Sequence, residues 1–185
     1  ETRFENYGAV TVDIKKTDSN YKIYSISGVL NYKNNINECH SLMEKIALEF
    51  NQETLFLLYG KPDLLKKEID NSQSISKYCE IIGTKDIVLD NESPLTAAKK
   101  GKESSMWKSI ESQTQNISDI SLSAGNTGAL LVMSRLILNT IEGINKPALA
   151  ALWPNNKNMS IVLDLGANID CNEKDLLDFS CMGAA

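Results

Sequence analysis

The sequence has no surplus of positive charge. Its 185 residues include 19 lysines and arginines against 24 aspartates and glutamates, which gives a net charge of −5. A protein that binds nucleic acid generally neutralises the phosphate backbone with an excess of basic side chains. We therefore expect no nucleic-acid partner for this chain.

Long apolar runs and paired cysteines are also lacking. No run approaches the roughly eighteen apolar residues of a transmembrane helix, and no basic segment followed by an apolar one opens the chain. The cysteines, Cys39, Cys79, Cys171 and Cys181, form no Cys-x-x-Cys pair. We expect a cytoplasmic protein with reduced thiols.

The composition that remains is that of a folded domain. Hydrophobic residues make up 42% of the chain and charged residues 23%, which are ordinary values for a globular protein with a core. The chain begins with Glu1 rather than methionine, and Ala185 falls within a helical pattern. We expect it to be a piece of a longer protein.

A segment of small residues, Ser-Ala-Gly-Asn-Thr-Gly at 123–128, stands out, and we call it the first turn. The apolar stretch at 117–122 predicts a strand before it. The helix formers of 129–141 follow it, and Gly143 is placed to cap that helix in a left-handed conformation. A strand feeding a glycine-rich turn at a helix N-terminus leaves backbone N–H groups available for a phosphate or carboxylate. The alternative is a tight turn that needs glycine only for its backbone angles.

A similar segment, Asp-Leu-Gly-Ala-Asn-Ile-Asp at 164–170, forms what we call the second turn. The apolar residues at 160–164 predict a buried strand that leads into it, and Asn172 is placed to cap a helix that starts at Glu173. In an open parallel sheet, ligands gather at the carboxyl ends of the strands. We therefore expect both turns to lie at the same edge of one parallel sheet and to form one site.

Strand and helix patterns alternate along the rest of the chain. Alternation over 9–14 and 21–30 predicts a hairpin. The later patterns predict helices at 42–50, from Pro62, and at 94–100, and strands at 54–59, 79–82 and 86–89. This order favours an α/β sandwich with a mainly parallel sheet.

The dense basic cluster of this acidic chain consists of Lys99, Lys100, Lys102 and Lys108. Gly101 is expected to end the helix at 94–100, and Ser104 or Ser105 to cap the next one. A solvated helix end would explain the lysines, and so would a site for an acidic partner or a bound phosphate.

Several segments carry a family pattern in the same order: Lys99–Met106, Ser123–Leu130, Gly143–Ala148, Leu163–Asp170 and Met182–Gly183. Together they resemble the bacterial phosphate acyltransferases of the PlsX type, from about residue 37 onward. The resemblance implies a three-layer αβα sandwich related to phosphotransacetylases and isopropylmalate dehydrogenases, usually as a homodimer. It also implies a reaction of phospholipid biosynthesis, in which acyl-[acyl carrier protein] and inorganic phosphate give acyl phosphate and free carrier. Peripheral membrane association is left open.

The N-terminal part departs from this family. Where its members carry Asp-Ala-Met-Gly-Gly-Asp, this chain has Gly-Val-Leu-Asn-Tyr-Lys at 28–33. We therefore distinguish an atypical hairpin segment at 1–35 from an acyltransferase-like α/β domain at 36–185 that is incomplete at its C-terminal side. Oxyanion stabilisation needs several groups held in one cleft, so we expect this piece alone not to reach the rate of the family.

Attack of phosphate on a thioester requires groups that bind a dianion and stabilise an oxyanion, and it requires no cofactor or covalent intermediate. We predict Asn126 and Asn168 as catalytic residues. The predicted phosphate- and substrate-binding residues are small or polar and belong to the two turns and the basic segment: Ser123, Ala124, Gly125, Asn126, Thr127, Gly128, Asp164, Gly166, Asn168, Lys100, Lys102, Ser104 and Ser105.

Neither a metal ion nor a cysteine nucleophile is expected. Asp164 and Asp170 have a spacing that is more typical of capping residues than of metal ligands. A nucleophilic thiol would need a base, and His40 is the one histidine available.

Two other classes of protein stay open. A phosphate- or nucleotide-binding module of related fold would use the first turn without acyl transfer, although its dehydrogenase relatives would not be expected to carry the segment at 99–106. A structural fragment would instead use the apolar helix at 129–141 for dimerisation.

Overall fold

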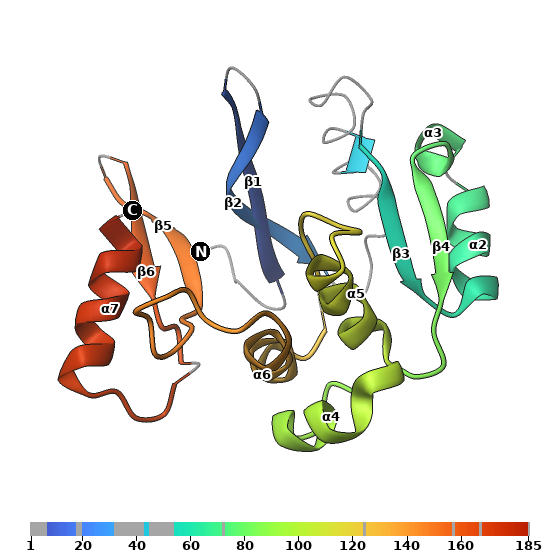
Figure 1. Cartoon of the computed structure of the whole chain (residues 1–185). Helices are drawn as coiled ribbons and strands as arrows, with labels where there is room; N and C mark the ends of the chain where they lie inside the picture. Colours follow the sequence, from blue (N-terminus) through green and yellow to red (C-terminus); the bar gives the residue numbers. More distant parts are fainter. Residues whose placement is uncertain are drawn as a thin grey trace. The chain divides into compact units, whose positions relative to one another are not determined.

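The computed structural model describes residues 7–17, 20–31, 43–44, 54–71, 73–123, 125–156, 158–166 and 168–184, with the backbone alone for the strands at 7–31 (Figure 1). Contacts divide the chain into two compact units, residues 1–83 and 84–185. Each unit has its own secondary structure and its own buried residues.

The first unit begins with the hairpin that the alternation predicts. Strand β1 (Tyr7–Thr17) pairs antiparallel with β2 (Asn20–Asn31), with a register irregularity near Val10. The helix predicted at 42–50 lies outside the described residues except for Met43 and Glu44, which are helical.

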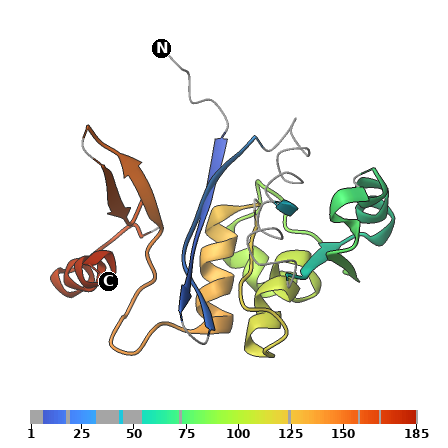
Figure 2. The same cartoon turned by 90° about the horizontal axis from the view of Figure 1, so that it is seen from above.

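A strand–helix–strand unit follows. Strands β3 (Phe56–Gly60) and β4 (Cys79–Gly83) pair in parallel, and helices α2 (Pro62–Asp70) and α3 (Gln73–Ser76) connect them. Proline favours the start of α2 because its fixed φ suits the first helical turn, where its missing N–H is not needed. Helix α2 lies beside the parallel pair in both views (Figure 1 and Figure 2). Both predicted strands and the predicted helix are therefore confirmed.

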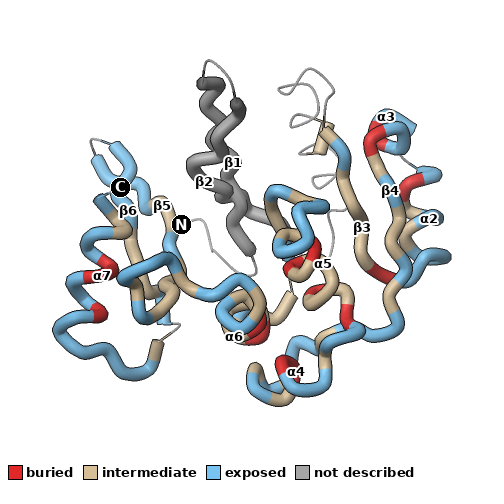
Figure 3. Tube along the Cα trace, in the orientation of Figure 1, coloured by how far each residue is buried: buried red, intermediate tan, exposed pale blue. Residues whose placement is uncertain are grey.

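The second unit contains a cluster of packed helices. These are α4 (Pro94–Lys100), the 3-10 helix η1 (Gly101–Glu103), α5 (Ser105–Thr114) and α6 (Thr127–Leu138). Their shared buried residues are small or apolar: Ala97, Ala98, Met106, Ile110, Ala129 and Met133 (Figure 3). Helix α4 ends before Gly101 as predicted. Of the two candidate caps, Ser104 caps α5, because its Oγ accepts the N–H of Trp107 at 3.2 Å.

The strand predicted at 86–89 is wrong. The structure has an isolated bridge between Asp86 and Ser104 in its place. Asp86 donates its N–H to the carbonyl of Glu103 and accepts the N–H of Ser105, and the ladder does not continue. Apolar residues in this segment therefore gave a false strand signal.

The strand predicted at 117–122 is also wrong. This stretch folds back on α5, where the N–H groups of Ile117 and Ser118 donate to the carbonyl of Ser112. In the described residues, no strand therefore leads into the first turn.

Helix α6 ends earlier than the prediction of 129–141. It stops at Leu138, and Asn139 has a positive φ of 62° with an extended ψ of −174°. Residues with a side chain rarely adopt this combination, so the helix ends in an unusual backbone conformation. Gly143, the predicted cap, has a φ of 85° but belongs to a separate turn, in which Ile144 N–H donates to the carbonyl of Ile141.

The last part of the chain is a hairpin followed by a helix. Strands β5 (Ala150–Pro154) and β6 (Met159–Leu163) pair antiparallel, and α7 (Glu173–Ala184) contacts β6, where Gly183 meets Leu163. The strand predicted at 160–164 is confirmed as β6, but it pairs antiparallel rather than parallel, and it is not buried, since Ile161 is 53% exposed. The helix predicted from Glu173 is confirmed.

The class of the fold is α/β. Among the described strands, however, only β3 and β4 pair in parallel, while β6 belongs to an antiparallel hairpin. The expectation that both turns lie at one edge of a parallel sheet is therefore wrong for this structure.

The close contact between Gly128 on α6 and Pro94 on α4 can be tested by substitution. A Cβ added at Gly128 would stand 2.7 Å from Cγ of Pro94. Alanine gains about 1 kcal/mol of helix propensity over glycine, but overpacking costs about 1–3 kcal/mol, and a proline ring cannot rotate away. We predict that Gly128→Ala lowers the free energy of unfolding by about 1 kcal/mol in urea denaturation.

The matched control for Gly128→Ala is Thr127→Ala, at the exposed neighbouring position of the same helix. It should change the free energy of unfolding by less than about 0.5 kcal/mol. A stabilised Gly128→Ala variant would show that Pro94 does not restrain α6.

Candidate functional site

Asn126 organises the first turn through its side chain. Its Oδ1 accepts the N–H of Ala129 at 3.0 Å, which caps α6. Its Nδ2 donates to the carbonyls of Leu89, Asp90 and Glu92 at 3.2, 3.2 and 2.8 Å. Both ends of the amide are therefore engaged, and the side chain ties the loop at 89–92 to the start of α6.

The backbone of the first turn keeps free donors. In the described part of the chain, no hydrogen-bond acceptor faces the N–H groups of Thr127 or Gly128, the first two residues of α6. Gly125 N–H is engaged, because it donates to Oγ of Ser123 at 3.2 Å. The free N–H groups lie at the positive end of the helix dipole, where an anion is stabilised. Ala124, which the sequence also indicates, lies outside the described residues.

The basic segment separates into paired and unpaired lysines. Lys108 forms ion pairs with Glu111 at 2.9 Å and Glu103 at 3.8 Å, and the bond to Glu111 raises its pKa. Within the described residues, Lys99, Lys100 and Lys102 form no ion pair and are exposed.

The serines of the basic segment are less exposed than these lysines. Lys102 lies over the ring of Trp107, with its Nζ 6.0 Å from the centroid, and remains exposed. Ser104 is buried as the α5 cap, and Ser105 is half-buried. The two serines of the predicted site therefore support α5, while the lysines remain open to a partner.

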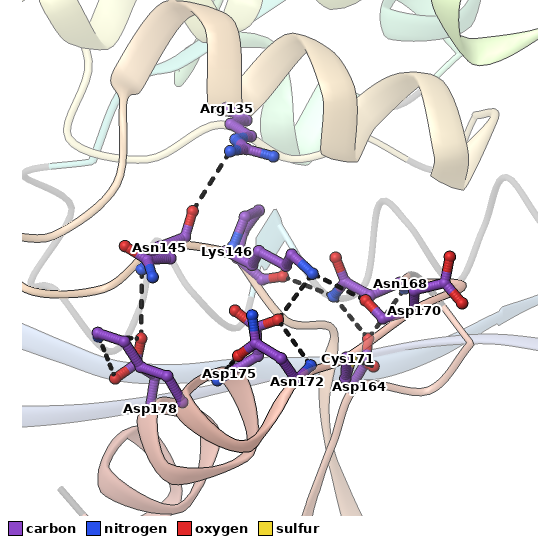
Figure 4. Close-up of polar contacts among 12 residues, drawn as sticks. Arg135, Asn145, Lys146, Asp164, Asn168, Asp170, Cys171, Asn172, Asp175 and Asp178 are labelled. Carbon is purple, nitrogen blue, oxygen red and sulfur yellow. Dashed lines mark hydrogen bonds and ion pairs between the residues drawn. The ribbon is translucent and has the colours of Figure 1, made fainter.

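Asp164 and Asn168 hold the second turn together. Oδ1 of Asp164 accepts the backbone N–H of Asn168 at 3.1 Å and its Nδ2 at 2.8 Å. Cys171 donates its thiol to the other oxygen of Asp164 at 3.3 Å (Figure 4). Gly166 has a φ of 77°, a region that favours glycine. The predicted site residues Asp164, Gly166 and Asn168 thus belong to one turn, in which Asp164 binds Asn168 and caps no helix, since α7 begins at Glu173.

The segment at 143–149, which we call the strap, connects the second turn to α6 and α7. Every second carbonyl in it accepts a hydrogen bond: Gly143 from Nζ of Lys174 at 3.1 Å, Asn145 from Nη2 of Arg135 at 3.3 Å, Pro147 from Nδ2 of Asn168 at 3.0 Å, and Leu149 from the N–H of Leu165 at 3.4 Å. Its N–H at Asn145 donates to Oδ2 of Asp178 at 3.3 Å. Figure 4 shows the contacts of Asn145 with Arg135 and with Asp178.

Lys146 and Asp175 form the central ion pair of this region, and sequence reasoning missed both. Nζ of Lys146 lies 2.7 Å from Oδ2 of Asp175 and donates to the carbonyl of Asp170, also at 2.7 Å. Asp175 also accepts the N–H of Asn172 at 3.1 Å, while Asn172 Oδ1 accepts the N–H of Asp175 at 2.9 Å. This reciprocal capping over Asn172-x-x-Asp175 is a signal that the sequence contained.

Lys146 and Asp175 each stabilise the charged form of the other. The bond from Lys146 and the N–H of Asn172 hold the pKa of Asp175 below its usual value, and Asp175 raises the pKa of Lys146. Because the pKa of Asp175 is lowered in the folded protein, its carboxylate stabilises the fold at pH values above the ordinary carboxyl pKa. That stability is lost as the pH falls through the folded-state pKa.

The thiols have the properties of unreactive groups. Burial and the nearby Asp164 carboxylate raise the pKa of Cys171, and burial raises that of Cys79. Both stay protonated near neutral pH, and the described cysteines, Cys79, Cys171 and Cys181, are free of disulfides. Cys39 and His40 lie outside the described residues. No group of three or more histidine, cysteine, aspartate or glutamate side chains in the described ranges could hold a metal ion.

The described contacts do not bring the two turns together. The first turn lies at the N-terminus of α6, whereas the strap meets α6 at Arg135, nine residues or roughly 13 Å farther along the helix. No helix in the described ranges is long and apolar enough to cross a membrane.

This chain is an α/β protein, and the family model described as "Fatty acid synthesis protein" matches its residues 40–185, so it belongs to that family. Several curated relatives bear the name phosphate acyltransferase. The relative from Pelagibacter ubique strain HTCC1062 is 53% identical over 135 residues, covering 73% of this chain and 40% of the relative. The resemblance to the PlsX-type acyltransferases is thereby confirmed.

More distant relatives give the same result. A phosphate acyltransferase from Rhodopseudomonas palustris strain BisA53 is 40% identical over 141 residues, covering 76% of this chain and 40% of the relative. One from Jannaschia sp. strain CCS1 is 36% identical over 132 residues, covering 70% and 36%. The chain therefore spans about 40% of the length of these curated relatives.

The double role of Asn126 can be separated by substitution. Asn126→Ala loses the cap, worth about 1 kcal/mol, and the donor to the loop, worth about another 1 kcal/mol. We predict a loss of about 2 kcal/mol in the free energy of unfolding for Asn126→Ala. Asn126→Ser keeps a capping oxygen but cannot reach the loop, and should lose about half as much.

The decisive comparison is Asn126→Asp, which keeps the acceptor but places a carboxylate against three carbonyls. Its stability in urea denaturation at pH 7 should fall at least as far as that of Asn126→Ala. An aspartate variant as stable as the parent would show that the loop at 89–92 does not depend on Asn126.

Proposed function

We propose that this chain carries the phosphate acyltransferase reaction, in which acyl-[acyl carrier protein] and inorganic phosphate give acyl phosphate and free carrier. The observation that carries the proposal is the 53% identity to the Pelagibacter ubique phosphate acyltransferase. The family match across residues 40–185 supports it. The same match favours an acyltransferase portion at 36–185, distinct from the hairpin segment at 1–35.

The reaction needs an anion site and an oxyanion site. A phosphate oxygen attacks the thioester carbonyl carbon, the carbon–sulfur bond breaks, and the carrier leaves as a thiol after taking a proton. No covalent enzyme intermediate is required, so the protein acts by positioning and by electrostatic stabilisation. The free N–H groups of Thr127 and Gly128 at the start of α6 are suited to the phosphate.

The predicted catalytic residues act, in this proposal, through the backbone that they shape. Asn126 holds the N-terminus of α6 in place, and Asn168 holds the second turn. The hydroxyls of Ser123 and Thr127 are exposed beside the first turn and complete the phosphate site. The exposed Lys100 and Lys102 are suited to the acidic acyl carrier protein.

The finer architecture is part of the proposal. The parallel β3–β4 pair with its helices is compatible with one portion of a three-layer αβα sandwich. We expect the complete assembly to be a homodimer that needs no cofactor.

The proposed function can be tested in a chimera, in which a relative supplies the part of the enzyme that this chain does not cover. The 135 residues of this chain that match the Pelagibacter ubique relative replace the corresponding segment of that relative, and phosphate-dependent release of free carrier from palmitoyl-[acyl carrier protein] is measured. We predict turnover within about tenfold of the intact relative. A folded chimera that releases no carrier, although the intact relative does so in the same assay, would overturn the proposal.

The basic segment gives a charge test in the same chimera. Lys100→Glu should raise the KM for the acyl carrier by roughly three- to tenfold at low salt, with a smaller effect at high salt. Lys66→Glu makes the same charge change at an exposed position of α2 and is the matched control. An equal effect of both variants, or no salt dependence, would count against a carrier site at Lys100.

A further inference from the structure

We propose that Pro94 is a positioning residue for the phosphate site, because its ring fixes the place of Gly128 at the start of α6. The proposal rests on the acyltransferase function above, in which the N–H of Gly128 is one of the phosphate donors. Pro94 belongs neither to the first turn nor to the predicted site residues.

Gly128 is explained by the closeness of Pro94 rather than by its own backbone angles. It is the second residue of α6, and its φ does not lie in the left-handed region. Inside a helix, glycine is a poorer choice than alanine. A Cβ at this position, however, would stand 2.7 Å from Cγ of Pro94. The missing side chain therefore lets the first residues of α6 and α4 approach each other.

The ring of Pro94 is held in place. Ring closure locks its φ and leaves Cγ only a small puckering motion. Pro94 is the first residue of α4, which is capped by the hydroxyl of Ser93. One turn farther along, Ala97 is 1% exposed and packs in the same cluster as Ala129, which is 0% exposed. The ring is therefore a fixed wall beside Gly128.

Pro94 restrains the start of α6 independently of Asn126. The Asn126 side chain acts through hydrogen bonds to the N–H of Ala129 and to the carbonyls at 89, 90 and 92. None of these bonds involves Pro94, so the helix cap would survive the loss of the ring. Gly128 would then be free to shift. Displacement of a positioned group by about 1 Å can cost roughly a hundredfold in rate.

Pro62 provides a matched comparison. It is also the first residue of its helix, α2, and its Cγ would stand 3.1 Å from a Cβ added at Gly83. The same arrangement of proline and glycine therefore occurs at a helix that contributes no residue to the predicted phosphate site.

The kinetic test is a double-mutant cycle in the active chimera. We expect Gly128→Ala to raise the KM for phosphate about tenfold, because the new methyl group meets the ring, while the KM for the acyl carrier stays unchanged. Pro94→Ala removes the wall and should raise the KM for phosphate about threefold. It keeps the Cβ of residue 94, which would lie at an ordinary 3.6 Å from the added methyl group. In the Pro94→Ala background, Gly128→Ala should therefore change the KM for phosphate by less than about twofold.

The control variant Pro62→Ala should leave both KM values unchanged. An equal rise in the KM for phosphate from Gly128→Ala in both backgrounds would overturn the proposal, because the methyl group would then obstruct the anion directly. Equal effects of Pro94→Ala and Pro62→Ala would also overturn it, as would a lower maximal rate of Pro94→Ala with an unchanged KM for phosphate.

Urea denaturation of the 185-residue chain tests the contact without catalysis. Gly128→Ala should lower the unfolding midpoint in the parent chain. In the Pro94→Ala background it should leave the midpoint unchanged or raise it, because the ring no longer opposes the better helix propensity of alanine. Equal decreases in both backgrounds would overturn the role of Pro94. An inactive chimera, together with a midpoint difference between the two backgrounds, would overturn the acyltransferase function alone.

Discussion

The complete burial of Ala129 and Met133 is the constraint on which the second unit depends. Both side chains are 0% exposed, and they place one face of α6 against α4 and α5. Once this face is fixed, the N-terminus of the helix lies where Asn126 can reach the loop at 89–92. Arg135, farther along the helix, lies where it can reach the strap. Apolar packing therefore determines where the polar contacts form.

The polar contacts in turn decide which groups remain for a ligand. The amides of Asn126 and Asn168 are occupied by backbone partners, so the residue types that suggested catalysis serve to build the turns. In the described residues of the first turn, the backbone N–H groups of Thr127 and Gly128 remain open. A backbone donor has a fixed direction, and its fixed dipole needs no reorganisation during a reaction. A site of this kind has no side chain that composition alone could reveal.

Local signals predicted the elements whose interactions are close in sequence. The proline at the start of α2, the capping Ser104 and the capping Asn172 each act within one helical turn, and all three helices are present. The parallel pair β3–β4 was readable from two apolar runs separated by a helix pattern.

Errors arose where the actual partner of a segment differs from the one that its residue pattern suggests. The apolar residues at 117–122 have strand periodicity, but Ser112 supplies their backbone partner. Residues 160–164 look like a buried strand, yet the partner of β6 is the preceding β5, and the hairpin leaves Ile161 exposed. The Lys146–Asp175 pair spans 29 residues, and single charged residues so far apart carry no detectable spacing signal.

The alternating carbonyl contacts of the strap make its length critical. Carbonyls at 143, 145, 147 and 149 bind partners that are themselves held by α6, α7 and the second turn. Insertion or deletion of one residue would move these carbonyls out of phase, much as a one-residue slip reverses the faces of a strand. It would also carry Lys146 away from Asp175. The turn at 155–158 closes only a hairpin tip and is free of this restriction. Changes of chain length are thus compatible with the hairpin tip and incompatible with the strap.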